Sequence, residues 1–350
     1  MVANRIKELD ALRGIAALCV VLFHFTLGRP EAQYGFHLGI TGVDLFFILS
    51  GFVIFMSVQK TTSALEFAIN RFTRLYPTYW TCVSITALMQ LLLMVYMYGN
   101  YSYLSVSKYV INLTMFQHYF KVNDIDGSYW TMIIEIVFYI CILILLVAKK
   151  TRYILPFSLA LLAIIGTYSI YLENIYPSLN SQLIYWFHLF THFPLFLAGI
   201  IFYKIYRKEG KLYFNYLILL CCFIVQISLF DNFEKTILYV SQTEYMIMLG
   251  IFFLIFVLFV NDKLEFLVSR PILFLGKISF ALYLIHQFIS TEIIIPLLAK
   301  IGIHFWTSAL IAFSICVLLA TLITYFIEIP LGKKLNLFLR TKFSFPTIHS

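Results

Sequence analysis

Three acid–base side chains stand inside long apolar stretches of the sequence. His24 lies in LDALRGIAALCVVLFHF, Asp44 in GITGVDLFFILSGF and Glu135 in GSYWTMIIEIVFYI. Ionisable residues in membrane segments are costly to bury and are often functional. A histidine beside a carboxylate can act as a general base, because the carboxylate orients the ring and stabilises its charged form. We therefore predict an acid–base site from these three residues, with isolated structural hydrogen bonds as the alternative.

The spacing of Arg13 and His24 predicts how these two residues are placed along their helix. Eleven residues make about three helical turns, so both lie on one helix face, roughly 16 Å apart. The same geometry places Asp44 about 6 Å and Glu135 about 10 Å below the outer ends of their own segments. Both carboxylates would then lie at a depth similar to that of His24. The depths agree, although they do not show that the three helices touch.

Two further groups of polar residues lie in or beside apolar segments. Arg71 and Arg74, in FAINRFTRLYP, are neighbours on one helix face. Guanidinium groups bind phosphate bidentately, so this pair could hold a phosphorylated ligand, or it could simply anchor the chain at the membrane surface. The segment LGKISFALYLIHQF carries the basic residue Lys277 near its start. It then presents three polar groups on one helix face, namely Ser279, Tyr283 and His286. These three should face the bundle, where they could line a tunnel or bridge helices.

The remaining polar residues in apolar segments fit plainer roles. His188 and His192 are four residues apart, but the sequence offers no third ligand at a suitable spacing, so we predict no metal site. Glu328 should pair with a basic residue on the inner side. The six cysteines form no Cys-x-x-Cys pair and no spaced Cys/His set, so the sequence indicates neither a disulfide framework nor a zinc site.

Composition decides the class of protein that must position these residues. The 350 residues are 61% hydrophobic and only 12% charged, and the mean hydropathy is +0.90. Soluble domains are about one quarter charged. The apolar runs are continuous, which excludes a transmembrane β-barrel. We predict an all-α, polytopic transmembrane helical bundle of about ten spans, at 11–28, 40–58, 77–98, 128–148, 153–172, 183–203, 212–230, 241–260, 277–298 and 307–329.

The basic residues predict the orientation of these spans. With both termini cytoplasmic, 20 of the 25 basic residues lie on the inner side. The outer side holds only Arg29, Lys108, Lys121, Lys235 and Lys300. This asymmetry follows the positive-inside rule. We expect an interfacial or re-entrant helix in 101–121, a membrane-embedded domain over 1–332 and a short basic cytoplasmic tail over 333–350.

Several motifs, in order along nearly the whole chain, resemble those of the integral-membrane acyltransferase 3 family. LDALRGIAALCVVLFH is similar to its basic-x10-His signature, GVDLFFILSGFVI to its second-span motif and NRFTRLYP to its Arg-x-x-Arg pair. YWTMIIEIVFY resembles its Trp-Ser-Leu-x-x-Glu motif, with Thr131 and Met132 in place of the common residues. LGKISFALYLIH and YFIEIP resemble its last two motifs, with Phe280 replacing a tyrosine.

The resemblance implies a membrane O-acyltransferase that uses cytosolic acyl-CoA, usually acetyl-CoA, without a metal. The acceptor would be a sugar hydroxyl of an extracytoplasmic cell-surface glycan or lipid-linked sugar, and the enzyme would reside in the bacterial plasma (inner) membrane. His24 would act as general base, oriented by Asp44 or Glu135, with an acyl-histidine intermediate as a variant. The donor would contact Arg13, Arg71, Arg74 and Lys277, and the acceptor side would include Trp130, Ser279, Tyr283 and His286.

A proton-coupled transporter or flippase for a glycan or lipid-linked precursor is the rival class. Such a carrier would also bury histidine and carboxylates. Transporters often show two matched halves with broken helices, and this sequence shows no such repeat. Nothing in either interpretation requires a nucleic acid.

Overall fold

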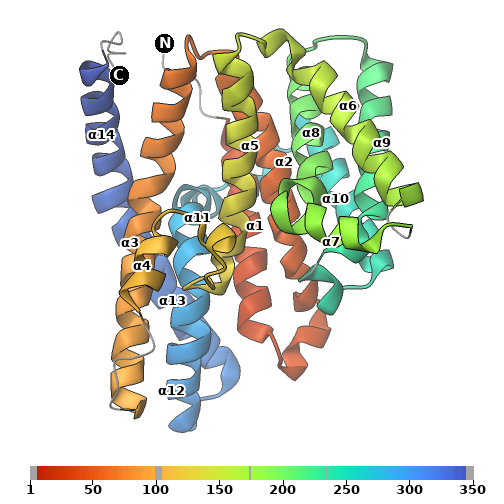
Figure 1. Cartoon of the computed structure of the whole chain (residues 1–350). Coiled ribbons are helices and arrows are strands. Elements are labelled where there is room, and N and C mark those ends of the chain that lie inside the picture. Colours follow the sequence, from red (N-terminus) through yellow and green to blue (C-terminus); the bar gives the residue numbers. More distant parts are fainter. Residues whose placement is uncertain (1–5, 99–104, 173–174, 234, 344–350) are drawn as a thin grey trace.

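The chain folds into a bundle of helices (Figure 1). The computed structural model describes residues 6–98, 105–172, 175–233 and 235–343, and every regular element in these ranges is helical. Within them, nine helical segments are long and apolar enough to cross a membrane, and Leu212–Ser228 is apolar but shorter. The predicted all-α, polytopic membrane bundle is confirmed.

The helices follow one another with short connections. Their bounds are α1 Lys7–Thr26, α2 Gly42–Val58, α3 Ala64–Tyr98, α4 Val106–Asn112, α5 Trp130–Val147, α6 Ile154–Thr167, α7 Pro177–Trp186, α8 Leu189–Tyr206, α9 Leu212–Ser228, α10 Gln242–Val260, α11 Arg270–Phe288, α12 Ile295–Lys300, α13 Phe305–Ile323 and α14 Ile329–Lys342. One π-helical turn, Ile289–Ile294, joins α11 to α12, and another, Thr324–Glu328, joins α13 to α14. Both π turns directly follow or contain residues of the predicted site motifs, and π turns are common at functional sites.

Two of the predicted spans differ from the structure in ways that matter for the site. Helix α3 begins at Ala64, well before the predicted start at residue 77, and it continues through Pro77. Hydropathy detects the apolar part of a helix and misses an amphipathic extension such as this one. The predicted span 183–203 is interrupted, since α7 ends at Trp186 and α8 begins at Leu189.

Glycines allow two helix pairs to approach closely. A β-carbon on Gly276 of α11 would lie 1.9 Å from the carbonyl oxygen of Asp10 in α1, and one on Gly14 would lie 2.7 Å from the Gly276 nitrogen. In the other pair, a β-carbon on Gly51 of α2 would lie 2.0 Å from the Phe196 oxygen of α8. Small residues at such crossings are typical of packed membrane helices. These contacts hold α1 and α2, which carry much of the site, against α11 and α8.

The exposed side chains fit a bundle surrounded by lipid. Leu220, Leu254 and Leu318, on α9, α10 and α13, are 54%, 57% and 58% exposed. Helix α8, in contrast, is almost wholly buried. Apolar outer helices around a packed centre are expected where the solvent is hydrocarbon.

Helix α1 begins and helix α14 ends toward the same end of the bundle, at the top of Figure 1. We call this the terminal end and the opposite one the distal end. Helix α14 lies along α3, where Arg340 forms an ion pair with Glu66 and the Asn336 amide donates to Asn70 and Thr73. The predicted basic tail from residue 333 therefore begins inside a docked helix, which continues to Lys342.

Candidate active site

A large cavity opens at the terminal end between α2, α3 and α14. Its volume is about 790 Å³. Basic side chains outnumber acids in its lining, which includes Lys60, Arg71, Arg74, Lys333 and Arg340 beside Glu66 and Glu328. Both acids already form ion pairs, with Arg340 and Arg74 respectively. The cavity is therefore suited to an anionic ligand.

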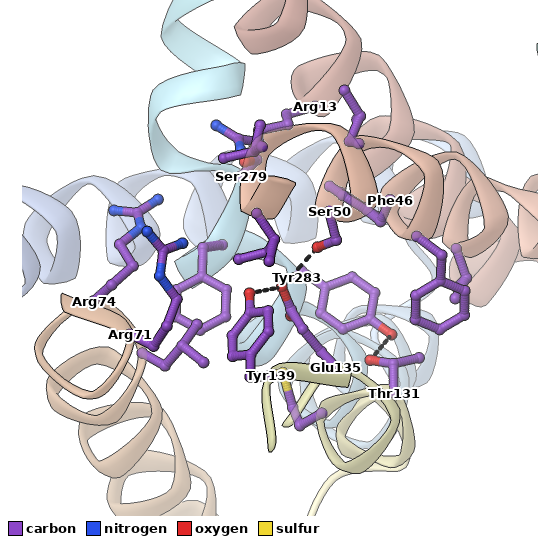
Figure 2. Close-up of a pocket in the computed structure, with 18 residues that line it drawn as sticks. Arg13, Phe46, Ser50, Arg71, Arg74, Thr131, Glu135, Tyr139, Ser279 and Tyr283 are labelled. Carbon is purple, nitrogen blue, oxygen red and sulfur yellow. Dashed lines mark hydrogen bonds between the residues drawn. The ribbon is translucent and has the colours of Figure 1, made fainter. Parts of the chain in front are cut away.

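A smaller cavity of about 120 Å³ lies at the centre, enclosed by α1, α2, α3, α5 and α11 (Figure 2). It gathers residues that the sequence places far apart. Six of the predicted site residues line it: Arg13, Arg71, Arg74, Glu135, Ser279 and Tyr283. The arginines lie toward one side of the cavity, and the Glu135 and Tyr283 side chains lie near its middle (Figure 2).

A third cavity of about 260 Å³ lies toward the distal end and reaches His24. Its lining includes Trp130, Lys235 and Gln287. A fourth cavity of about 210 Å³ meets His24 from another side, with Arg29 and Glu292 in its lining. His24 is thus accessible from two cavities at this end of the bundle.

The first three cavities form a series along the bundle. Arg71 and Arg74 line both the terminal cavity and the central one. Tyr283 lines both the central cavity and the distal one that contains His24. Neighbouring cavities therefore share side chains all the way from the basic terminal cavity to His24, and Tyr283 lies between the central and distal cavities.

His24 pairs with another histidine, His286. The two lie in the last turns of α1 and α11, and His24 Nδ1 lies 3.0 Å from His286 Nε2. His24 Nδ1 also lies 3.0 Å from the Val20 oxygen. His286 is wholly buried. Ser279 and Tyr283 are buried too, so the predicted polar face of this helix does turn into the bundle.

Glu135 lines the central cavity, and its hydrogen bonds are to residues other than His24. Its Oε1 accepts from the Ser50 hydroxyl at 2.7 Å and from the hydroxyl of Tyr139, which lies one turn further along α5. Both bonds are drawn in Figure 2. The carboxylate is thereby held on the same cavity wall as Arg13, Arg71 and Arg74.

Asp44 turns away from all of these cavities. It is buried, and its Oδ1 lies 3.7 Å from Nδ1 of His192 on α8. Successive helical residues are about 100° apart, so Phe46 and Phe47 of α2 can face the central cavity while Asp44 faces α8. The expected contact among His24, Asp44 and Glu135 is therefore wrong: each has its own partners. Depth along a helix does not fix the direction of a side chain.

The three arginines have different surroundings. Arg74 forms an ion pair with Glu328, so the predicted basic partner of Glu328 is confirmed. Arg71 donates to the Ser57 hydroxyl at 3.0 Å and lies over the Phe67 and Tyr139 rings. Arg13 lies 3.4 Å from Asp10. Lys277 lines neither the terminal nor the central cavity, and its ammonium group donates to the Tyr325 hydroxyl at 2.8 Å.

The turn before α5, beside the distal cavity, is hydrogen-bonded to the end of α11. Asp126 accepts from the Ser128 amide and hydroxyl, both at 2.9 Å, and from the Phe288 amide at 3.0 Å. Burial raises the pKa of the Asp126 carboxyl, against the effect of these hydrogen bonds. The contact to Phe288 fixes the end of α11 just after His286. Trp130, the first residue of α5, lies under the Lys235 ammonium group at 5.1 Å.

His188 and His192 have separate surroundings. His188 packs edge-to-face against His118 with ring centroids 4.0 Å apart, and burial lowers its pKa to about 4. His192 lies beside Asp44. The pair that the sequence offered as a possible metal ligand set is thus divided between two environments.

Comparison with known sequences identifies the family of this chain. A family model described as an acyltransferase domain, that of the acyltransferase 3 family, matches residues 6–328. The chain belongs to the acyltransferase 3 family. It is accordingly a multi-pass membrane acyltransferase, and the resemblance seen in the motifs is confirmed.

Several curated proteins are similar to this family member. ORF330 of Acidianus two-tailed virus, an inferred acetyltransferase, is 24% identical over 294 residues, which cover 82% of this chain and 84% of that protein. Nodulation protein 10 of Rhizobium leguminosarum bv. viciae is 26% identical over 40% of this chain and 44% of its own length. Exopolysaccharide production protein ExoZ of Rhizobium meliloti (strain 1021) is 32% identical over 66 residues, 19% of this chain and 20% of that protein. No solved structure matches the chain.

Sequence reasoning missed several residues of this candidate site. Tyr139 could have been found, because it stands four residues after Glu135 on the same helix face. Ser50, Lys60 and Lys235 carry no such local signal. Their places depend on how α2, α14 and the loop before α10 pack against distant segments.

Proposed function

We propose that this acyltransferase moves an acyl group, most simply acetyl, from acyl-CoA at the terminal end to a sugar hydroxyl at the distal end. The series of cavities from the basic terminal cavity to His24 is the observation that carries the proposal. A donor with a phosphorylated head and a long narrow arm suits a wide basic entrance followed by a narrow passage.

The terminal cavity supplies the contacts for the donor's phosphates. Lys60, Arg71 and Lys333 line it without being the partners of its two acids. Arginine binds phosphate through paired hydrogen bonds, and lysine binds it as a point charge. The basic residues assigned to the inner side by the positive-inside rule support a cytosolic position for this end, where acyl-CoA is found. Arg13 then contacts the donor deeper in the passage.

The distal cavity supplies the acceptor site. Trp130 offers an aromatic face there, and Gln287 offers an amide beside His24. Two similar proteins are named for exopolysaccharide production and nodulation, which supports a glycan or lipid-linked sugar as acceptor. Their rhizobial sources also support a bacterial plasma membrane as the location.

In the proposed reaction, His24 acts as general base. Its ring takes the proton of the acceptor hydroxyl while the hydroxyl oxygen forms a bond to the thioester carbonyl carbon. The carbon–sulfur bond then breaks, and the acyl group stays on the sugar oxygen. His24 returns its proton to the sulfur, so that CoA leaves as the thiol. Glu135 and the arginines act on the donor side of Tyr283, because they line the central cavity.

The test is His24→Ala in inverted membranes supplied with radiolabelled acetyl-CoA. We expect label on a glycan or lipid-linked sugar with the native protein and none with the variant. His304→Ala, which changes an exposed histidine outside these cavities, is the matched control and should transfer label normally. Undiminished transfer by His24→Ala would exclude the proposed base. Transport of a labelled glycan without acetylation by the native protein would support a carrier instead.

A further inference from the structure

The hydrogen bonds of His286 determine which of its nitrogens carries the proton. Its Nδ1 lies 3.1 Å from the Leu282 oxygen and 2.8 Å from the Tyr283 oxygen. Carbonyl oxygens only accept, so this Nδ1 must be protonated. In the neutral ring, Nε2 is therefore left with a lone pair and can accept.

The same reasoning then applies to His24. Its Nδ1 lies 3.0 Å from the Val20 oxygen and 3.0 Å from His286 Nε2, and both of these atoms are acceptors. His24 Nδ1 must therefore carry the proton. The lone pair of the neutral ring is on Nε2, the nitrogen that a base needs to expose.

We propose that His286 is a positioning residue for His24. It selects the His24 tautomer with a free Nε2, and its own Nε2 accepts a hydrogen bond from the His24 Nδ1–H while the His24 ring is charged during transfer. The inference rests on the proposed function of His24 as base. His286 itself neither gains nor loses a proton in this scheme. It occupies the place that Asp44 or Glu135 was expected to fill, since a neutral acceptor also orients an imidazole ring.

The packing around the pair supports this role. His286 is wholly buried, and the π-helical turn Ile289–Ile294 follows its helix directly. Lys235, Tyr239 and Tyr283 line one cavity beside His24, and Arg29 and Glu292 line the other. These groups determine the electrostatic field on the sides of the His24 ring that face the two cavities. His286 is on the opposite, enclosed side, where it can hold the ring without blocking an acceptor.

Two substitutions separate the two sets of hydrogen bonds of His286. His286→Asn places an amide where Nδ1 stands, so the bonds to Leu282 and Tyr283 can persist while the acceptor for His24 is lost. His286→Gln places an amide oxygen near the position of Nε2, so the acceptor is restored. Ser290→Ala, at a buried residue one turn further along, controls for any change to the helix end.

The readout is the chemical state of His24, which requires neither donor nor acceptor. Diethyl pyrocarbonate labels the free nitrogen of neutral imidazole, and peptide mass spectrometry can follow His24 alone from about pH 8 downward, through and below the ordinary range of histidine titration. We expect His286→Asn to move the midpoint of the labelling curve to lower pH, because the charged ring loses an acceptor. Acetyl transfer should fall about tenfold or more, as expected for a lost hydrogen bond to a charged group. His286→Gln and Ser290→Ala should remain near the native curve and rate.

Each result decides between the alternatives. An unchanged labelling curve in His286→Asn, or a Gln variant as impaired as the Asn variant, would overturn the positioning role. A shifted curve alongside normal transfer by His24→Ala would instead show that the histidine pair exists and that the proposed function of His24 is wrong.

Discussion

Gly14 of α1 packs directly against Gly276 of α11, and the sequence offset between them, 262 residues, is the same as that between His24 and His286. The two helices therefore run parallel and in register from the glycine contact to the histidine pair. Ten residues, about 15 Å, separate the two contacts along each helix. The position of the proposed base thus depends on a helix crossing remote from it.

The glycine contact predicts a large effect of a single added methyl group. Gly276→Ala would place a β-carbon 1.9 Å from the Asp10 oxygen, so the helices must separate. Overpacking of this kind costs about 1–3 kcal/mol or more. We expect a lower thermal unfolding temperature in detergent and reduced acetyl transfer. Gly250→Ala is the matched control, because nothing lies within 4 Å of its added carbon. Equal behaviour of the two variants would contradict the close packing.

The position of Tyr283 between the central and distal cavities predicts that it couples CoA release to acetyl transfer. Its hydroxyl lies 2.9 Å from the Thr131 hydroxyl, and its ring stands between the central and distal cavities. Tyr283→Ala should join the cavities and admit water to the thioester. We expect CoA release to exceed acetylated product, with the ratio measured by a thiol assay beside radiolabel transfer. Tyr283→Phe keeps the ring and should keep the two yields nearly equal. Full coupling in the Ala variant would show that the ring is no barrier.

Arg71 and Arg74 should differ although they are neighbours on one helix. Arg74→Gln leaves the Glu328 carboxylate, whose side chain is only 4% exposed, without its ion-pair partner. We expect lower thermal stability, restored in the double variant Arg74→Gln/Glu328→Gln. Arg71→Gln should instead keep its stability and weaken acetyl-CoA binding about tenfold or more, as for a lost charged hydrogen bond. Calorimetric titration of purified protein measures the affinity. Unchanged affinity would make Arg71 a topological anchor.

Glu135 allows charge to be tested apart from hydrogen bonding. Ser50 and Tyr139 both donate to Oε1, and the amide oxygen of Glu135→Gln can accept both bonds. We expect this variant to keep its thermal stability while acetyl transfer falls, because the carboxylate charge faces the donor cavity. Glu135→Leu should also lose stability by about 1–3 kcal/mol, the cost of leaving buried donors unsatisfied. Normal transfer by the Gln variant would limit Glu135 to a structural role.

The amino-acid sequence by itself determined the class and most of the membrane helices, and it singled out many of the residues that line the cavities. Continuous apolar segments can only be helices in a membrane, because lipid offers no partner for backbone groups. The 3.6-residue period then placed Ser279, Tyr283 and His286 on a single face that proved buried. Such inferences are local, and they hold whatever the helices pack against.

The tertiary structure alone decided which of these groups meet. His24 was expected beside Asp44 or Glu135, yet its partner is His286, which lies 262 residues away. Asp44 faces His192, and Glu135 faces Ser50 and Tyr139. A helix fixes the height and relative phase of its own side chains, but the rotation of one helix against another depends on close contacts such as Gly14 with Gly276. Those contacts arise from the packing of distant segments, and no local pattern specifies them.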